Sequence, residues 1–522
     1  MTNALSSLTT DVISSIIFEE PSDYLGDPDF NDKWYETLKM GTLSVPLFKQ
    51  MPWAVRITGI KHDGLIRYRF FLNRERLLVA SPKALSEVLV TKSHMFEKPT
   101  AISRTLGRIL GTGVVFAEGD EHKLQRRNLL PAFHFRHMKN LYPIIWSKAR
   151  ESVFSMMELC GSDTSAVLEV SSWASRCALD IIGVAGMGVN FGAIQNGNSP
   201  LVATYAQISS PTMQAKVALV LANFLPPWLI NLAPIKHNGD MQAAANHIRA
   251  VCRDVIRETK QKIALKEEAS ATFVSIALKG GCFSDEGLVD QAMTILAAGH
   301  ATTATTLTWA VYLLSRFPDK QARLRAEVRQ SLPSVKEGCQ VMSGDIDRLA
   351  YLNAVCSEVL RTHTPTPITT REAVCDTTIQ GQAVPKGTRI IIAPWGTNVD
   401  PSLWGDDADQ FRPERWLLDG AGADAVAEQP DPLSGPAPRK AGGGATSNYA
   451  FLTFLHGPRS CLGAGFARAE LACLLAAWVG RFEFTLADER LADERNLEMV
   501  SFLLAPKPAH GLHLRIKVVD GW

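Results

Sequence analysis

The chain has 522 residues, of which 46% are hydrophobic and 20% are charged, as in an ordinary globular protein with a sizeable core. Lysine and arginine number 54 against 53 aspartates and glutamates, so the charge gives no reason to expect a nucleic-acid partner. The nine cysteines are sparse and form no CxxC pair, which leaves a zinc site or a redox dithiol without support.

One large domain is expected behind a short N-terminal segment. We assign residues 1–50 to that segment, near a membrane, and residues 51–522 to the domain. No run of about eighteen uncharged apolar residues occurs, so no transmembrane helix is predicted. The longest apolar segment, Val217–Pro234, contains a Pro-Pro pair that interrupts any helix. It is either a buried helix pair joined by a loop or a loop that dips into a membrane surface.

The first regular elements are a hairpin and a helix. Residues 65–72 and 76–80 read as two strands around the turn Asn73–Glu75. Ser81 can then cap a helix that has Pro82 at its first position. From about residue 100 to residue 360 the pattern is mostly helical.

The longest predicted helix covers residues 285–316. Ser284 can cap it, acidic residues occupy its first turn, and Phe317-Pro318 ends it. Its middle carries almost no charge, and a helix that is apolar nearly all round belongs in a core. At 1.5 Å per residue, such a helix spans roughly 45 Å, enough to cross a whole domain.

Beyond residue 363 short strands return, at Thr388–Ala393 and Leu512–Val519. Between them, residues 419–447 are rich in Gly, Ala and Pro and read as a flexible surface insertion within the domain. The predicted fold class is therefore mainly α with a small β-rich subdomain.

The most informative stretch is Phe454–Glu470, FLHGPRSCLGAGFARAE. A lone cysteine is usually structural, but glycines flank Cys461 on both sides and allow its backbone to approach another group closely. An amphipathic helix follows at once, so its positive end and the loop N–H groups are expected to favour a thiolate. Arg459 adds a positive charge suited to a carboxylate of a bound group.

This stretch resembles the haem-binding signature of the cytochrome P450 family, F-x-x-G-x-R-x-C-x-G. Phe454, Gly457, Arg459, Cys461 and Gly463 match its fixed positions. The resemblance implies the cytochrome P450 fold and a haem b whose iron is bound by the Cys461 thiolate. It also implies that Arg459 pairs with a haem propionate, that Phe454 lies against the ligand loop, and that Gly463 belongs to the cofactor site.

A second pattern is a Glu and an Arg at i and i+3, Glu358 and Arg361. Alone, such a pair is usually a solvated surface pair. Arg415, in the segment PERW, completes the Glu–Arg–Arg triad that the family buries near the haem loop. The resemblance implies a structural role for these three, since buried charges are tolerated only as a fully paired network.

The long helix contains Ala298–Thr303, which resembles the oxygen-binding motif of the family. Gly299 removes a side chain where a ligand must approach, and the Thr302 hydroxyl can donate to bound dioxygen; small residues for close helix packing are the plain alternative. Ala301 stands where the family usually has Asp or Glu, so substrate or water has to supply the proton, or the reaction is not simple hydroxylation. His300 points about 100° away around the helix.

Three further residues match positions that face the haem propionates in the family: His122 and Arg126 in the segment HKLQRR, and Arg371 in PITTREA. Guanidinium groups are good partners for carboxylates. The plain alternatives are a basic helix surface for His122 and Arg126, and an arginine at a strand edge for Arg371.

The resemblance covers about residues 50–520 and implies a monooxygenase that inserts one oxygen atom of O2 into a small apolar or aromatic substrate. The sequence around Cys461 resembles that of fungal members of the family that modify secondary metabolites. No flavin or nicotinamide fingerprint is evident, so electrons are expected from a separate NADPH–cytochrome P450 reductase. The enzyme is expected at the cytoplasmic face of the endoplasmic reticulum, in peripheral contact with the membrane.

Alternatives stay open at this point. The same haem fold can catalyse oxidative phenol coupling, dehydration or peroxide rearrangement, and a non-catalytic haem sensor is a more distant alternative. Family comparison places substrate-facing residues around 100–118, 205–235, 294–303, 364–370 and 500–505, with Thr364, Ile368 and Phe502 as candidates. This is an analogy of site position, and it names no substrate.

Overall fold

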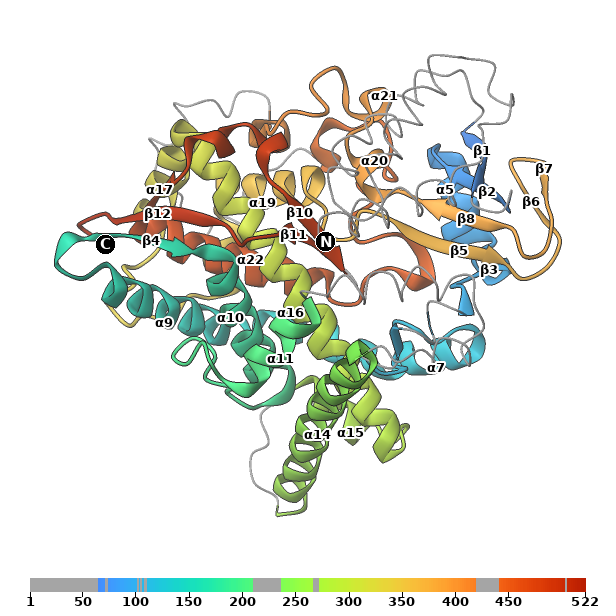
Figure 1. Ribbon diagram of the computed structural model, residues 1–522, viewed down its shortest axis with the longest axis horizontal. Coiled ribbons are helices and arrows are strands. Elements are labelled where there is room, and N and C mark those ends of the chain that lie inside the picture. The colour runs from blue at the N-terminus through green and yellow to red at the C-terminus, as the bar shows by residue number, and fades with distance from the viewer. Residues whose placement is uncertain are drawn as a thin grey trace, which may run out of the picture.

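The computed structural model describes residues 64–70, 74–100, 103, 106–107, 110–209, 236–265, 272–418, 441–502 and 505–522. Helices fill most of the molecule, and a small sheet lies at one side (Figure 1). The predicted class, mainly α with a β-rich subdomain, is confirmed. The helices are α5 (Pro82–Ser86), α7 (Gly119–Leu129), α8 (Phe135–Lys139), α9 (Tyr142–Cys160), α10 (Val170–Ile182), α11 (Pro200–Ser209), α14 (Lys236–Ala264), α15 (Phe273–Lys279), α16 (Asp285–Arg316), α17 (Pro318–Ser331), α18 (Ser343–Asp347), α19 (Ala350–Thr362), α20 (Pro394–Asn398), α21 (Pro401–Trp404) and α22 (Ala464–Arg481).

Helix α16 crosses the middle of the molecule (Figure 1). It begins and ends at the predicted residues: the Ser284 hydroxyl accepts a hydrogen bond from the Gly287 backbone at 3.1 Å, and Phe317 caps the other end. Helices α10, α14 and α22 pack along it, and its second half is almost wholly buried. The prediction of a long core helix is confirmed.

The larger sheet has the strand order β1-β2-β8-β5-β3. The predicted hairpin is present, with β2 beginning two residues before the predicted start, because the antiparallel register extends to the pair Phe70–Arg74. The predicted strand near Thr388 is β8, which runs parallel to β2. The strands are β1 (Leu65–Phe70), β2 (Arg74–Val79), β3 (Phe96–Glu97), β5 (Thr369–Ala373) and β8 (Arg389–Ile392).

A second sheet, of order β4-β12-β9, packs near the chain end, and two short hairpins complete the strands. Its central strand β12 is the predicted C-terminal strand. These strands are β4 (Ser165–Glu169), β6 (Thr377–Ile379), β7 (Gln382–Val384), β9 (Phe482–Leu486), β10 (Met499–Phe502), β11 (Ala505–Pro508) and β12 (His513–Val518).

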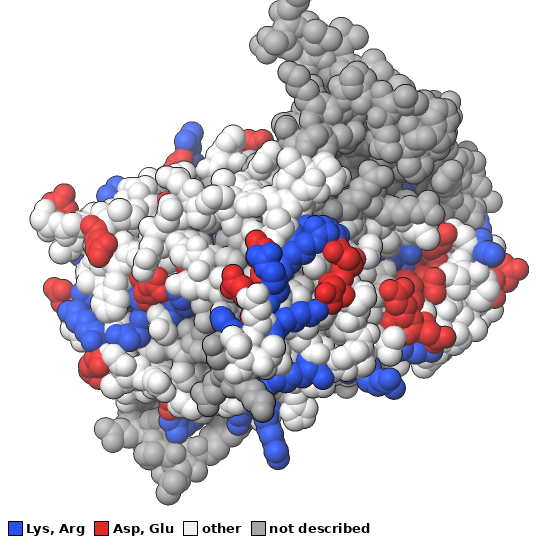
Figure 2. Space-filling view, turned by 90° about the horizontal axis from the view of Figure 1, so that it is seen from below, with Lys and Arg blue, Asp and Glu red and all other residues white. Residues whose placement is uncertain are grey.

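Several predictions fall on other parts of the chain. The N-terminal segment 1–50, the apolar segment Val217–Pro234 and residues 419–440 of the proposed insertion lie outside the described residues. Among the helices that the structure describes, none is both long and apolar enough to cross a bilayer. On the face seen in Figure 2, acidic and basic side chains are interspersed, as the near-zero net charge suggests.

The Glu358 carboxylate on α19 is the centre of a buried polar network. Arg361 donates to both of its oxygens, at 2.8 and 2.7 Å, and Arg415 donates to one of them at 3.0 Å. The Trp416 indole and the Arg412 backbone donate as well, both at 2.9 Å. With five donors, this fully buried carboxylate is well compensated.

The network extends to the loop that precedes Cys461. Arg361 donates to the carbonyl of Asn398 at 2.8 Å. The Asn398 side chain in turn accepts from the Leu452 backbone at 2.7 Å and donates to Thr453 at 2.8 Å. Through Arg361 and Asn398, the triad thus fixes the position of the segment 452–453 relative to α19.

We expect Glu358→Gln to destabilise the fold by about 3–5 kcal/mol, because it removes the buried charge that pairs with Arg361 and Arg415 and leaves Arg415 with Asp407 alone. Chemical denaturation of both proteins measures the loss. Glu489→Gln, at an exposed glutamate, is the matched control and should leave the free energy of unfolding unchanged. Equal stability of Glu358→Gln and the wild type would contradict this role.

Candidate active site

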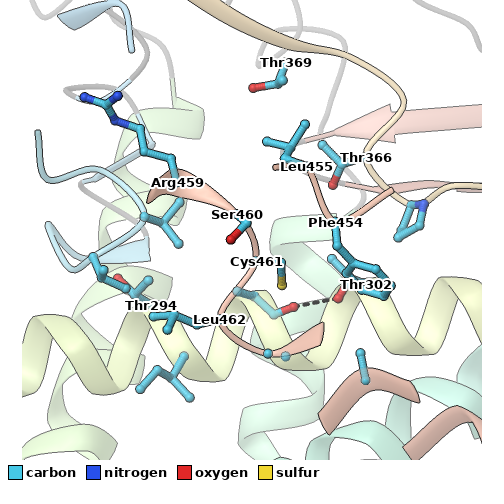
Figure 3. A pocket seen from close by; sticks show the side chains of 18 of the residues that line it. Thr294, Thr302, Thr366, Thr369, Phe454, Leu455, Arg459, Ser460, Cys461 and Leu462 are labelled. Carbon is cyan, nitrogen blue, oxygen red and sulfur yellow. Dashed lines mark hydrogen bonds between the residues drawn. The ribbon is translucent and has the colours of Figure 1, made fainter. Parts of the chain in front are cut away.

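A cavity of about 660 Å³ lies between α16 and the loop that carries Cys461. In Figure 3 the Cys461 sulfur points from its loop toward α16, and Thr302 faces it from that helix. The cavity is lined by both motifs that the sequence singled out, although they are about 160 residues apart. The apolar side chains that surround it include Val114, Val115, Phe116, Ile182, Phe273 and Ile295.

The Cys461 loop owes its shape to backbone geometry. The Cys461 N–H donates to the Phe454 carbonyl at 2.8 Å, which closes the loop, and Ser460 donates to Gly457 at 3.0 Å. Gly457 has φ +75°, and a Cβ there would collide with the Leu89 carbonyl. Only glycine meets both conditions. Helix α22 starts three residues after Cys461, as the sequence predicts.

Opposing influences act on the ionisation of Cys461. The accessible surface of the thiol faces the cavity. Burial raises the pKa of the Cys461 thiol, whereas the Gly463 backbone N–H and the Arg126 charge lower it. The loop N–H that was expected to favour a thiolate is thus in place, and a bound iron would stabilise the thiolate further.

Cationic side chains gather on one side of the cavity. His122, Arg126, Arg371 and Arg459, the four predicted residues, all line it, and Lys98 joins them. Burial lowers the pKa of Lys98 to about 8, with the Arg371 charge next in importance. Burial also lowers the pKa of Arg371 to about 10 and that of His122 to about 4.

Arg459 and Lys98 share one acidic partner, Glu118. Arg459 donates to the Ser93 carbonyl at 2.6 Å and pairs with Glu118, whereas its Nε has no hydrogen-bond partner. Lys98 donates to Glu118 at 3.2 Å. A single carboxylate thus serves a group of buried cations, which leaves an excess of positive charge for an anionic ligand.

Two of the predicted cations contact nearby backbone. Arg126 donates to the Ser460 carbonyl at 2.6 Å, next to the predicted metal ligand. Arg371 donates to the Thr370 carbonyl at 2.7 Å. These backbone hydrogen bonds hold the two side chains in place in the cavity wall.

These features fit haem b. A sulfur ligand faces an apolar cavity, and buried cations at its edge, one of them with an unpartnered Nε, match the two propionates of the group. Lys98 and Glu118 were missed from the sequence. A cation next to Pro99 gives no local pattern, and only the tertiary fold brings Lys98 beside the helix start at Glu118.

On α16, the Thr302 hydroxyl donates to the Ala298 carbonyl at 2.7 Å, a bond drawn in Figure 3, and its oxygen borders the cavity. Gly299 also borders the cavity, but a Cβ on it would lie 2.9 Å from Ile182 of α10. Gly299 therefore serves the close approach of two helices as well as the cavity wall. Ala301 has no group that can carry a proton.

His300 points away from the cavity, as predicted. Its Nε2 shares a hydrogen bond of 2.8 Å with Ser175 of α10, and its ring packs edge-on against Tyr205 at 4.8 Å between centroids. Burial lowers the pKa of His300 to about 4, so the ring is neutral at physiological pH. It links α16 to α10 and α11 and cannot replace the missing carboxylate.

The remaining predicted residues differ in whether they line the cavity. Phe454, Gly463 and Ile368 line the cavity, whereas Thr364 is buried outside it. The side chain of Phe502 lies outside the described residues.

No sequence motif indicates how α16 holds the segment 110–114. Thr294 donates to the Leu110 carbonyl at 2.8 Å, and Gln291 accepts from the Val114 backbone at 3.0 Å. Asp290 accepts from the Thr112 hydroxyl at 2.6 Å and pairs with Arg249 of α14 at 2.6 Å. One wall of the cavity is thus fastened to α16 by successive polar side chains.

Comparison with known proteins agrees with this site. The family model for cytochrome P450 matches residues 61–512. The chain belongs to the cytochrome P450 family. The P450 monooxygenase ALT8 of Alternaria alternata is 43% identical over 93% of this chain and 88% of its own length. FUM15 of Gibberella moniliformis is 43% identical over 94% and 87%, and sphH of Aspergillus fumigatus is 44% identical over 89% and 82%. This P450 is a haem b monooxygenase.

We expect Cys461→Ala to abolish the red-shifted absorbance band of the reduced, CO-bound P450, because that band requires a thiolate ligand. Absorbance difference spectra measure it, and Cys375→Ala, at an exposed cysteine, is the control. A normal band in Cys461→Ala would exclude this residue as the ligand.

Gly457→Ala is expected to lower both the haem content and the melting temperature, because the new Cβ meets the Leu89 carbonyl. Gly381→Ala is a matched control, since Gly381 has φ +80° but nothing within 4 Å of the added carbon. Both variants bear the backbone strain of a positive φ, typically about 1–3 kcal/mol, so their difference reports the collision alone. Equal haem content in the two would contradict this role for Gly457.

Proposed function

We propose that this P450 inserts one atom of O2 into a small apolar or aromatic molecule of fungal secondary metabolism. The observation that carries the proposal is the apolar cavity bordered by Cys461 on one side and Thr302 on the other. Among the described residues that line it, none is acidic, which disfavours cationic substrates. The fungal origin of the relatives supports the metabolic setting.

Bound haem would supply the reductive activation of O2, with the Cys461 thiolate holding its iron. The chain's own residues do the rest. Basic side chains at one side of the cavity would hold the propionates: Lys98, His122, Arg126, Arg371 and Arg459. The apolar wall orients the substrate and excludes water, which strengthens electrostatic interactions inside.

Thr302 is the proposed hydrogen-bond donor at the oxygen side. Its hydroxyl can turn from the Ala298 carbonyl toward the cavity, because that carbonyl bond is an extra one within the helix. A hydroxyl at this place would hold a proton or a water molecule against the reacting oxygen.

P450 monooxygenases generally need a redox partner, and we propose NADPH–cytochrome P450 reductase. The outer sides of α7 and α8 support this choice. Lys123, Arg127 and Arg136 are exposed there, beside the exposed apolar side chains Leu124 and Phe135. Basic and apolar groups together suit an acidic partner surface.

Peripheral attachment at the cytoplasmic face of the endoplasmic reticulum, where such a reductase would be met, stays part of the proposal. The segments predicted to contact a membrane, residues 1–50 and Val217–Pro234, lie outside the described residues. Fractionation of cells that express the full chain tests this assignment.

A second candidate reaction is kept because of Ala301. Oxidative phenol coupling, dehydration and peroxide rearrangement do not place an oxygen atom of O2 in the product by the same proton-dependent step, so they tolerate a helix without the usual carboxylate.

Turnover under ¹⁸O2 with the reductase and NADPH separates these reactions. We expect one labelled oxygen atom in the product, measured by mass spectrometry across a panel of apolar and aromatic compounds that shift the ferric Soret band. Product without label would favour coupling or another oxidation, and no NADPH consumption with any compound would contradict the enzyme activity.

Thr302→Val is expected to raise the share of consumed O2 that leaves as hydrogen peroxide, roughly tenfold or more, because general acid assistance is worth about 10²–10⁴ in rate. Thr308→Val is the matched control: Thr308 makes the same kind of bond, to the Ala304 carbonyl at 2.8 Å, but does not border the cavity. Equal peroxide yields from both variants would remove Thr302 from the reaction.

A further inference from the structure

A cationic side chain of α22 packs against the segment that precedes Cys461. The Arg468 guanidinium lies over the ring of Phe454, with its central carbon 5.1 Å from the ring centre, and over the ring of Phe451, at 5.3 Å. Both distances fall within the range of about 6 Å over which a cation and an aromatic face attract each other. Arg468 does not line the cavity, so the contacts of the cavity wall leave it unexplained.

The position of this guanidinium is set by groups around the buried triad. Arg468 Nη1 donates to the Ser357 hydroxyl of α19 at 3.4 Å. The Phe451 ring meets Trp416 edge-on, with 5.7 Å between centroids, and the Trp416 indole donates to Glu358 at 2.9 Å. Arg468 therefore has a defined place between α19, α22 and the chain that leads to Cys461.

Phe454 connects the cation to Cys461. The Phe454 carbonyl accepts the Cys461 N–H at 2.8 Å, and both residues line the cavity. Figure 3 shows their side chains on the same loop, at the border of that cavity. The rings of Phe454 and Phe451 lie with centroids 6.3 Å apart and planes at 43°. Arg468 thus contacts the ring of the residue whose backbone holds Cys461 in place.

A charge at this place acts on electron uptake. Arg468 and the two phenylalanine rings are half-buried, so the charge is screened less than it would be in water. Reduction of a bound ferric iron by one electron from an external donor adds one unit of negative charge to the site. A fixed cation nearby stabilises the reduced form and so raises the reduction potential. Removal of the cation lowers the potential whichever other groups contact Arg468.

A purely structural contact is the alternative. Arg468 could only join α22 to the loop, as any side chain of similar length would. A half-buried guanidinium between two phenylalanine rings is a costly choice for that purpose, because an apolar side chain fills the same space without desolvating a charge. The two explanations make different predictions for variants that keep or lose the charge.

We propose that Arg468 is a positioning residue of this P450, which acts through the Phe454 ring to raise the reduction potential of the bound haem. The inference rests on Cys461 as the proposed iron ligand and on no particular substrate. Its consequence is that the first electron from the redox partner is accepted more readily, whatever reaction follows in the cavity.

Spectroelectrochemistry of the haem-loaded full chain, with dye mediators and no turnover, measures the midpoint potential. Arg468→Met removes the charge but keeps a long side chain. At the midpoint of the wild type, we expect the ratio of reduced to oxidised haem in Arg468→Met to be severalfold lower. Arg468→Lys keeps the charge and should remain close to the wild type.

Two further variants guard this comparison. Arg150→Met is the matched control, because the Arg150 guanidinium of α9 also lies over a ring, that of Phe154 at 5.8 Å, and neither residue lines the cavity. It should leave the potential unchanged. Arg468→Gln is a second neutral variant that can still donate to Ser357, and it should show the same lowering even where Arg468→Met retains too little haem to measure.

A double-mutant cycle tests the route through the ring. We expect the shift caused by Arg468→Met to be smaller in a Phe454→Leu background than in the wild type, because residues that act together are not additive. A shift of full size in that background would show that the charge acts without Phe454 and would contradict the proposed route.

An unmoved midpoint in both neutral variants would overturn the inference. So would equal shifts in Arg468→Lys and Arg468→Met, which is the result that a purely structural contact predicts. Failure of the ligand assignment has a different signature, since the wild type itself would then lack the red-shifted band of the reduced, CO-bound protein.

Discussion

The pairing of the buried Glu358 carboxylate with Arg361 and Arg415 is the interaction on which the rest of the site depends. A charge in the core is tolerated only when every oxygen is satisfied, and here five donors meet one carboxylate. Because Arg361 also donates to Asn398, the same network fixes the strand of chain that leads into the Cys461 loop. The position of the Cys461 sulfur therefore depends on the Glu358–Arg361–Arg415 network, which does not itself line the cavity.

The site combines two opposite electrostatic environments. On one side of the cavity, buried cations share Glu118 and keep an excess of positive charge. On the other, α16 presents threonine hydroxyl groups among the apolar side chains of α16 and α22. This division assigns the anionic edge of a cofactor to the first side and leaves the second for oxygen, substrate and protons. This division of the cavity arises because α16 lies opposite the Cys461 loop.

Much of this was predictable because it depends on local pattern. The bounds of α16 follow from caps and a proline, and the Cys461 loop follows from its glycines and the helix behind it. Lys98 and Glu118 were not predictable, since their burial and partners arise only when distant segments meet. The burial of the Cys461 thiol, which raises its pKa, was not predictable either, because a helix start is visible in a sequence whereas the depth of a side chain is not.

Helix α7 joins the outside of the molecule to Cys461, the proposed iron ligand. Its exposed face carries Lys123 and Arg127, and from its inner face Arg126 donates to the carbonyl of Ser460, one peptide bond from Cys461. A hydrogen bond to that peptide polarises the group beside the sulfur. A partner that tilts α7 by a fraction of an ångström would thus alter the electron density available to the sulfur, so docking and redox potential become properties of the same short helix.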